Sequence, residues 1–124
     1  GYNAPYQWLS RDDAQVKKYI ADELCGGLFS NSFYRGFFKG LIYINKRSSG
    51  AMINKNLKMF FVSGEKDPVG NCGRGVEEAV EFYRDQRIAN IQLKLYPNAR
   101  HEILNEINRE EVYNDLLKWI IDNQ

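Results

Sequence analysis

The single histidine of the chain, His101, and the acidic residue Asp67 are the side chains whose types and spacing suggest chemistry. His101 lies just past an alternating apolar stretch that ends at Pro97, and Asp67 lies just past an earlier, continuous apolar run. An imidazole can take the proton of a serine hydroxyl, while a carboxylate fixes its tautomer and stabilises the imidazolium that forms. The pair therefore indicates the general base and the orienting acid of a nucleophilic hydrolysis.

The third group of such a triad, the serine nucleophile, has no match. A G-x-S-x-G elbow requires glycines two positions before and after the serine, and Ser63 has Phe61 at the first of these positions. We therefore expect the nucleophile to be missing from this chain, which would be inactive alone. The plain alternative is a turn at Asp67-Pro68 and a surface histidine. The order of the two residues, each after its own strand, favours chemistry.

The other polar candidates are weaker. We interpret the loop carboxylates as solvated, and Asp12 and Asp13 as favouring the start of a helix. Cys72 is a possible thiol nucleophile, but no second pair of acid and base supports it. The spacing of the two cysteines fits neither a disulfide framework nor a metal site, and with one histidine we expect no zinc site. The loop carboxylates meant here are Glu65, Glu102 and Glu106.

Length and composition indicate one domain with its own core. The chain has 124 residues, with 44% hydrophobic and 27% charged residues, as in ordinary globular proteins. A net charge of +1 gives no electrostatic case for a nucleic-acid partner. No apolar run approaches the roughly 20 residues of a membrane span, so we expect a cytoplasmic protein. The chain opens at Gly1 without a methionine, and we interpret this start as a cloning boundary or an internal cut rather than a natural beginning.

The first part of the chain is aromatic and irregular. We expect a helix capped by Ser10 and ended by Cys25-Gly26-Gly27, with Val16 on its buried face. A second helix is predicted over residues 32–46, followed by a loop at 48–50. Its aromatic stripe is best explained by core packing, although an acyl pocket or contact with a membrane surface would also use it. The stripe contains Phe29, Phe33, Tyr34, Phe37 and Phe38.

From residue 57 the pattern becomes β-α-β-α, which predicts an α/β fold with a parallel sheet. We expect strands at 57–62 and 91–95, a helix at 75–86, and a last helix that begins with an Asn108–Glu111 capping box. Ligands of such sheets bind at the carboxyl ends of the strands, where Asp67 and His101 lie. The outer edge of the first strand has no partner, so we expect self-association, by edge pairing or by exchange of residues 1–30.

Two runs resemble the α/β-hydrolase superfamily, serine hydrolases of the lysophospholipase and monoacylglycerol lipase type. Residues 60–70 resemble the acid-bearing segment, and residues 93–106 the histidine segment. Residues 3–46 look like part of the helical cap and the helix that returns to the core. The resemblance implies a cap segment at 1–30, and a C-terminal piece of the core at 31–124 that includes its last two strands.

The resemblance also implies function. Asp67 would be the triad acid and His101 the general base, in an enzyme that cleaves carboxylic esters without a cofactor, in the cytoplasm and possibly at a membrane. The substrate would be lipid-like or another small ester. A related branch is classed with serine aminopeptidases, so a peptidase or amidase of the same fold stays open. A non-catalytic interaction domain on the same scaffold is the other alternative, because a fold does not fix a function.

Overall fold

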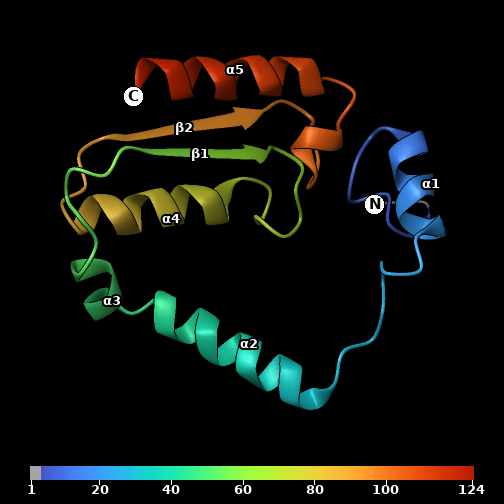
Figure 1. The fold of residues 1–124 in the computed structure, drawn as a ribbon, viewed down its shortest axis with the longest axis horizontal. Helices are drawn as coiled ribbons and strands as arrows, with labels where there is room; N and C mark the ends of the chain where they lie inside the picture. The colour runs from blue at the N-terminus through green and yellow to red at the C-terminus, as the bar shows by residue number, and fades with distance from the viewer. Residues whose placement is uncertain (1–3) are drawn as a thin grey trace.

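A parallel pair of strands lies at the centre of the computed structural model, which describes residues 4–124 apart from the side chain of Arg47. β1 (Met59–Gly64) pairs with β2 (Ile91–Tyr96) in a register that runs from Met59↔Ile91 to Gly64↔Tyr96. The two strands therefore end side by side, and the loops that follow them leave the sheet at the same edge (Figure 1). The predicted parallel α/β arrangement is confirmed.

Helices cover both faces of this sheet. α4 (Arg74–Asp85) lies on one face and α5 (Arg109–Asp122) on the other (Figure 1). Because neighbouring side chains of a strand point to opposite faces, Phe61 packs against Tyr83 of α4 with the rings tilted, while Phe60 stacks on Trp119 of α5. The core cluster on the α5 face holds Tyr96, Ala99, Ile103 and Val112, with Val62 and Leu116 packed against it.

The first helix, α1 (Asp13–Ala21), stands beside the carboxyl ends of the strands (Figure 1). Its N-cap is Asp12, whose side chain accepts from the N–H groups of Ala14 and Gln15. The predicted cap, Ser10, was therefore wrong: the Ser10 hydroxyl donates instead to the Asn105 carbonyl, 2.8 Å away. The helix also ends at Ala21, before the predicted stop at Cys25. Residues 1–3 of the predicted cap segment lie outside the described residues.

The second helix, α2 (Asn31–Ile44), buries none of its residues. Phe33 is 47% exposed, Phe37 50% and Phe38 54%, so the expectation of core packing for this stripe is wrong in the described chain. Instead, the rings pack on one another along the helix, by stacking in Phe33–Phe37 and Tyr34–Phe38 and edge to face in Phe37–Phe38. The residues predicted as a loop at 48–50 belong to a short helix, α3 (Arg47–Ala51), which approaches α4 at Gly50. The boundary predicted at residue 30 stays a prediction.

The segment after β2 leads through a short 3-10 helix, η1 (Ile103–Asn105), into α5. α5 begins after Asn108, as expected, but the predicted capping box does not form. The Asn108 amide oxygen accepts from Arg11 rather than from the helix, and its amide nitrogen donates to Glu111. The physical reason is that the N-terminal segment competes for this cap. None of the described helices is both long and apolar enough to cross a membrane.

Candidate active site

Asp67 and His101 meet at the carboxyl ends of the two strands. His101 Nδ1 lies 3.0 Å from Asp67 Oδ2. Since an ionised carboxylate can only accept, we assign the proton of this bond to Nδ1, and in the neutral ring Nε2 then has a free lone pair. The Asp67 side chain is 8% exposed, whereas the His101 side chain is 38% exposed. The structure thus brings the predicted pair together, with the acid buried and the imidazole accessible.

Asp67 is held by the tight turn that follows β1. Its N–H donates to the Gly64 carbonyl at 3.1 Å, and its own carbonyl accepts from Cys72 N–H at 2.8 Å. The second carboxylate oxygen, Oδ1, accepts from Val69 N–H at 2.9 Å. Each oxygen of the carboxylate therefore has its own donor, and the one that faces His101 cannot rotate away without breaking the Val69 bond.

Gly64 lets the histidine loop approach β1 closely. A Cβ atom at this position would collide with the backbone carbonyls of Ala99 and Arg100, so a side chain cannot be accommodated. Two hydrogen bonds use this proximity: Lys66 N–H donates to the Ala99 carbonyl at 2.8 Å, and Glu65 N–H to the Tyr96 carbonyl at 3.0 Å. The acid loop and the histidine loop are thus joined directly through their backbones.

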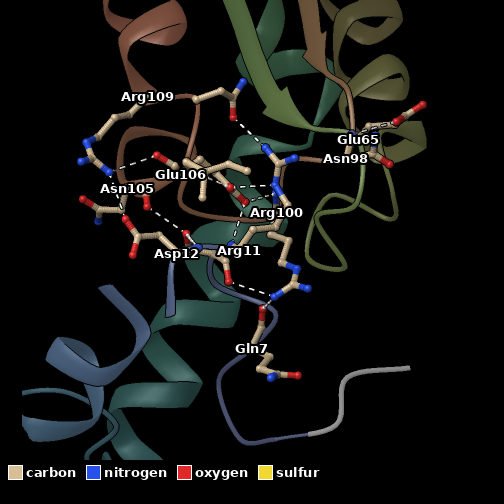
Figure 2. A network of polar contacts seen from close by, with 12 residues as sticks. Gln7, Arg11, Asp12, Glu65, Asn98, Arg100, Asn105, Glu106 and Arg109 are labelled. Atoms are coloured by element: carbon tan, nitrogen blue, oxygen red, sulfur yellow. Dashed lines mark hydrogen bonds and ion pairs between the residues drawn. The ribbon is translucent and has the colours of Figure 1, made fainter. Parts of the chain in front are cut away.

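The histidine loop turns at Asn98, which has a positive φ of 59°. Asparagine tolerates this left-handed conformation better than most residues. Its N–H donates to the Glu65 carboxylate at 3.1 Å, the contact that appears beside the strands in Figure 2. Glu65, interpreted from the sequence as solvated, therefore links the two loops although its side chain is exposed. The Glu102 carboxylate accepts from the side-chain amide of Asn105, at the end of η1, at 3.0 Å.

The N-terminal segment lies against the histidine itself. His101 N–H donates to the Trp8 carbonyl at 3.3 Å, and Glu102 N–H to the Leu9 carbonyl at 2.8 Å. The rings of Trp8 and His101 pack with centroids 5.2 Å apart. Sequence reasoning missed Trp8 because nothing local links it to a residue so far along the chain.

Glu106 is the second residue that sequence reasoning missed. It was expected to be solvated, yet it is fully buried and its carboxylate lies between the N-terminal segment and the histidine loop. The physical reason is a set of backbone N–H groups that compensates the burial of the charge. The sequence gives no signal for this pairing, because Arg11 is followed directly by two other acidic residues, Asp12 and Asp13.

A cluster of polar and charged side chains lies between β2 and α5. Lys94 and Tyr96 both donate to Asp115 Oδ2, at 2.5 and 3.0 Å. The hydrogen bond from Lys94 lowers the pKa of Asp115 and raises that of Lys94. Burial, followed by the bond to Asp115, raises the pKa of Tyr96 well above its usual range. These groups therefore keep their charges, or in Tyr96 its proton, throughout the neutral range and act as structural supports.

At Asp12 the electrostatics favour the ionised form. Desolvation raises its pKa, but the backbone bonds from Gln15 and Ala14, together with Arg109, outweigh that effect and lower the pKa overall. The prediction that Asp12 helps to start the first helix is confirmed by its capping bonds.

Cys72 is exposed, and its backbone φ of 52° places it in the turn after Asp67. Among residues 4–124 no group of three side chains could hold a metal ion.

Comparisons with known proteins show the family and the fold of the chain. The sequence model of the family described as "Serine aminopeptidase, S33" matches residues 2–108. The chain belongs to this family of α/β-hydrolases. The structure of a highly thermostable carboxyl esterase from Bacillus coagulans, in complex with glycerol, is similar with a TM-score of 0.83 and 25% sequence identity. That similarity covers 98% of this chain and 40% of the esterase.

A search of curated proteins gives no match. Because this S33 chain spans less than half of the esterase, the comparison covers only part of the hydrolase fold. The part that it covers contains both strands of the sheet and the two loops with Asp67 and His101. The resemblance inferred from residues 60–70 and 93–106 to an α/β-hydrolase is therefore confirmed at the level of family and fold.

Proposed function

We propose that this chain supplies the acid and the base of a serine carboxylic ester hydrolase, with Asp67 as the triad acid and His101 as the general base. The observation that carries the proposal is the 3.0 Å contact between His101 Nδ1 and Asp67 Oδ2, at the ends of two adjacent parallel strands. A carboxylate in such a contact orients the histidine of a catalytic triad and stabilises the imidazolium that forms.

The proposed reaction uses the nitrogen that this contact leaves free. His101 Nε2 takes the proton of the attacking serine as its oxygen bonds to the ester carbonyl carbon. The resulting imidazolium then gives that proton to the oxygen of the leaving alcohol as the ester bond breaks. Water repeats the sequence on the acyl-enzyme and releases the acid. Asp67 stabilises the imidazolium in both halves without taking its proton.

The proposal places the serine outside these 124 residues, and this chain alone would then be inactive. The absence of a G-x-S-x-G elbow supports it. The substrate class we propose is a lysophospholipid or monoacylglycerol type of ester, met in the cytoplasm or at the periphery of a membrane. The resemblance of residues 60–70 and 93–106 supports this class, and the carboxyl esterase with a similar structure supports ester chemistry.

Replacement of the base tests the proposal. In the full-length protein, His101→Ala should lower kcat for a p-nitrophenyl ester by at least about 10³-fold, because loss of the base disables the whole triad. A matched control is Asn123→Ala at the far end of α5, which removes a side-chain donor to Trp119 and should leave kcat unchanged. An unchanged rate in His101→Ala would refute the proposal and favour a non-catalytic domain on the hydrolase scaffold.

The family description favours one second candidate, hydrolysis of an amide. A serine aminopeptidase uses the same acid and base but must protonate a leaving amine. Parallel assays of p-nitrophenyl esters and aminoacyl p-nitroanilides on the full-length protein separate the two. A higher kcat/KM for the anilides, abolished by His101→Ala, would assign the peptidase reaction instead.

A further inference from the structure

Glu106 has the surroundings of a built site rather than of a surface carboxylate. It is 0% exposed. One oxygen, Oε1, accepts from the backbone N–H groups of Arg100 at 2.8 Å and Arg11 at 3.2 Å. The other, Oε2, accepts from Arg11 Nε at 2.9 Å and from Ile107 N–H at 3.1 Å. Burial of a carboxylate is costly unless charge and hydrogen bonds compensate it, and here both do.

The four donors come from two segments that are distant in the sequence. Arg11 belongs to the segment before α1, while Arg100 and Ile107 belong to the loops on either side of η1. Figure 2 shows Glu106 between Arg11 and Arg100, with the N-terminal segment on one side and the loop after β2 on the other. The carboxylate therefore binds the N-terminal segment to the loop that carries the histidine.

Further hydrogen bonds follow the same line of contact. Arg100 donates through Nη1 to the carbonyls of Gln7 and Ser10, and the Ser10 hydroxyl donates to the Asn105 carbonyl at 2.8 Å. Arg109 donates to Asp12 at 3.1 Å. We call the joined segments, residues 7–12 and 100–109, the polar clamp. Glu106 lies at its centre, because its carboxylate accepts from backbone N–H groups of both segments and from the Arg11 guanidinium.

His101 sits inside this clamp. The residue before it, Arg100, is held through its N–H by Glu106, and His101 N–H itself is held by the Trp8 carbonyl. The Trp8 ring then packs on the imidazole. The position of Trp8 depends in turn on the Ser10 and Arg11 contacts that follow it in the chain. The backbone of the histidine is therefore fixed from both sides, and each side leads back to Glu106.

We propose that Glu106 is a positioning residue of the hydrolase reaction, which holds His101 at its distance from Asp67 by fastening residues 7–12 to the histidine loop. This inference rests on the proposed function, since it assigns a role through His101. Glu106 touches neither the substrate nor the reacting atoms. Its contribution is to keep the imidazole in one orientation, so that Nε2 points to the serine while Nδ1 keeps its bond to the acid.

The test is Glu106→Gln in the full-length protein, assayed with a p-nitrophenyl ester. Glutamine keeps the size, but its NH₂ group must face N–H donors that the carboxylate accepted, so part of the clamp opens. We expect kcat to fall about 10- to 100-fold with KM changed less than about twofold, because a misplaced base costs rate rather than binding. The matched control, Glu110→Gln, changes an exposed glutamate four positions along and should retain the wild-type kcat.

A pH profile separates positioning from general damage to the fold. If the clamp loosens, His101 spends less time beside the Asp67 carboxylate, and the imidazolium loses a negative neighbour that stabilises it. The acidic limb of kcat/KM should then move to lower pH in Glu106→Gln. A variant that was only partly unfolded would lose amplitude at every pH, with the limb in place. That second pattern would overturn the assignment.

Ser10→Ala is the second variant, for the case in which Glu106→Gln does not fold. It removes the bond to the Asn105 carbonyl and the acceptor for the Asp12 N–H, and it leaves the Glu106 carboxylate intact. We expect the same fall in kcat at constant KM, but smaller, at about three- to tenfold. If both variants, or Ser10→Ala alone where Glu106→Gln cannot be purified, retain the wild-type kcat and pH profile, the inference is wrong.

His101→Ala, measured alongside, distinguishes the two failures. An inactive His101→Ala together with fully active clamp variants would overturn the role of Glu106 alone and leave the proposed function standing. An active His101→Ala would overturn both, because no base would then need positioning.

Discussion

Replacement of Asp67 by asparagine tests the geometry of the pair most sharply, because the two carboxylate oxygens have different partners. Oδ1 accepts from Val69 N–H at 2.9 Å, and Oδ2 accepts from His101 Nδ1 at 3.0 Å. An amide offers one acceptor and one donor in place of two acceptors. Asp67→Asn must therefore fail one of the two partners, and the structure decides which one.

If the amide oxygen faced His101, the NH₂ group would face Val69 N–H, and two donors would meet at a side chain that is 8% exposed. An unsatisfied buried donor costs about 1–3 kcal/mol. If the NH₂ group faces His101 instead, the free-energy cost is lower, because the imidazole can move its proton from Nδ1 to Nε2 and accept from the amide. We therefore expect the NH₂ group to face His101. Nε2 then carries a proton and cannot take the proton of the serine.

This wrong tautomer should cost about 10⁴-fold in kcat. That loss corresponds to about 5.4 kcal/mol of transition-state stabilisation. The assay is initial-rate hydrolysis of a p-nitrophenyl ester by the full-length protein. The matched control is Asp122→Asn at the far end of α5, where the same chemical change removes only an exposed ion pair with Lys118 and should leave kcat unchanged.

The tautomer itself can be observed. Because His101 is the only histidine of the 124-residue chain, its ring nitrogens give one set of NMR signals that needs no assignment. We expect the neutral ring to carry its proton on Nδ1 in the wild-type chain and on Nε2 in Asp67→Asn. The reasoning is refuted by a variant that keeps more than a tenth of the wild-type kcat, or by one whose ring still carries the proton on Nδ1.

Three further predictions concern the support of the pair. Gly64→Ala should lower the free energy of unfolding by about 1–3 kcal/mol, because its Cβ meets the backbone carbonyls of the histidine loop; urea denaturation measures it, and a wild-type midpoint would contradict it. Asp115 has a lowered pKa in the folded chain, so its stabilisation is complete above about pH 4 and is lost as the pH falls through the lower folded value. Stability should therefore fall less steeply from pH 5 to pH 2 in Asp115→Asn, and equal slopes in urea titrations would disprove this. Finally, we predict that the chain self-associates through the open edge of β1, and light scattering that gives only a monomer at working concentrations would contradict it.

The parts of the fold that the sequence predicted well are those with a strong local signal. The apolar run at 59–62 and the alternation at 91–95 fixed β1 and β2 to within two residues at each end, since period and turn residues act locally. Parallel pairing followed from their alternation with helices. The meeting of Asp67 and His101 followed as well, because parallel strands in register end at the same edge.

The helix caps were predicted poorly, for a reason that lies in tertiary contacts. Ser10 and Asn108 are both good capping residues, and each was expected to serve its own helix. In the structure, the hydroxyl of Ser10 bonds to the Asn105 carbonyl and the amide oxygen of Asn108 accepts from Arg11. Both side chains are diverted to the polar clamp, whose two halves are separated by most of the chain. Local patterns do not contain that information.

The aromatic stripe of α2 was also predicted wrongly, although its local pattern is strong. Its spacing is that of a buried helix face, yet Phe33, Phe37 and Phe38 are exposed. Periodicity reports which face is apolar but not what lies against it. By contrast, the carboxylates of Asp67 and Glu106 each accept hydrogen bonds from donors within the described chain.

The loop that carries His101 is held by hydrogen bonds to two other segments of the chain. The acid loop and the histidine loop are joined by backbone bonds at Gly64–Lys66, and the histidine loop is joined to residues 7–12 by Glu106. Every one of these contacts lies within residues 4–124. The orientation of His101 toward Asp67 therefore depends on bonds internal to this chain, whereas the exposed face of α2 takes no part in them. Variants of α2 should accordingly leave the tautomer of His101 unchanged, and variants of the clamp should not.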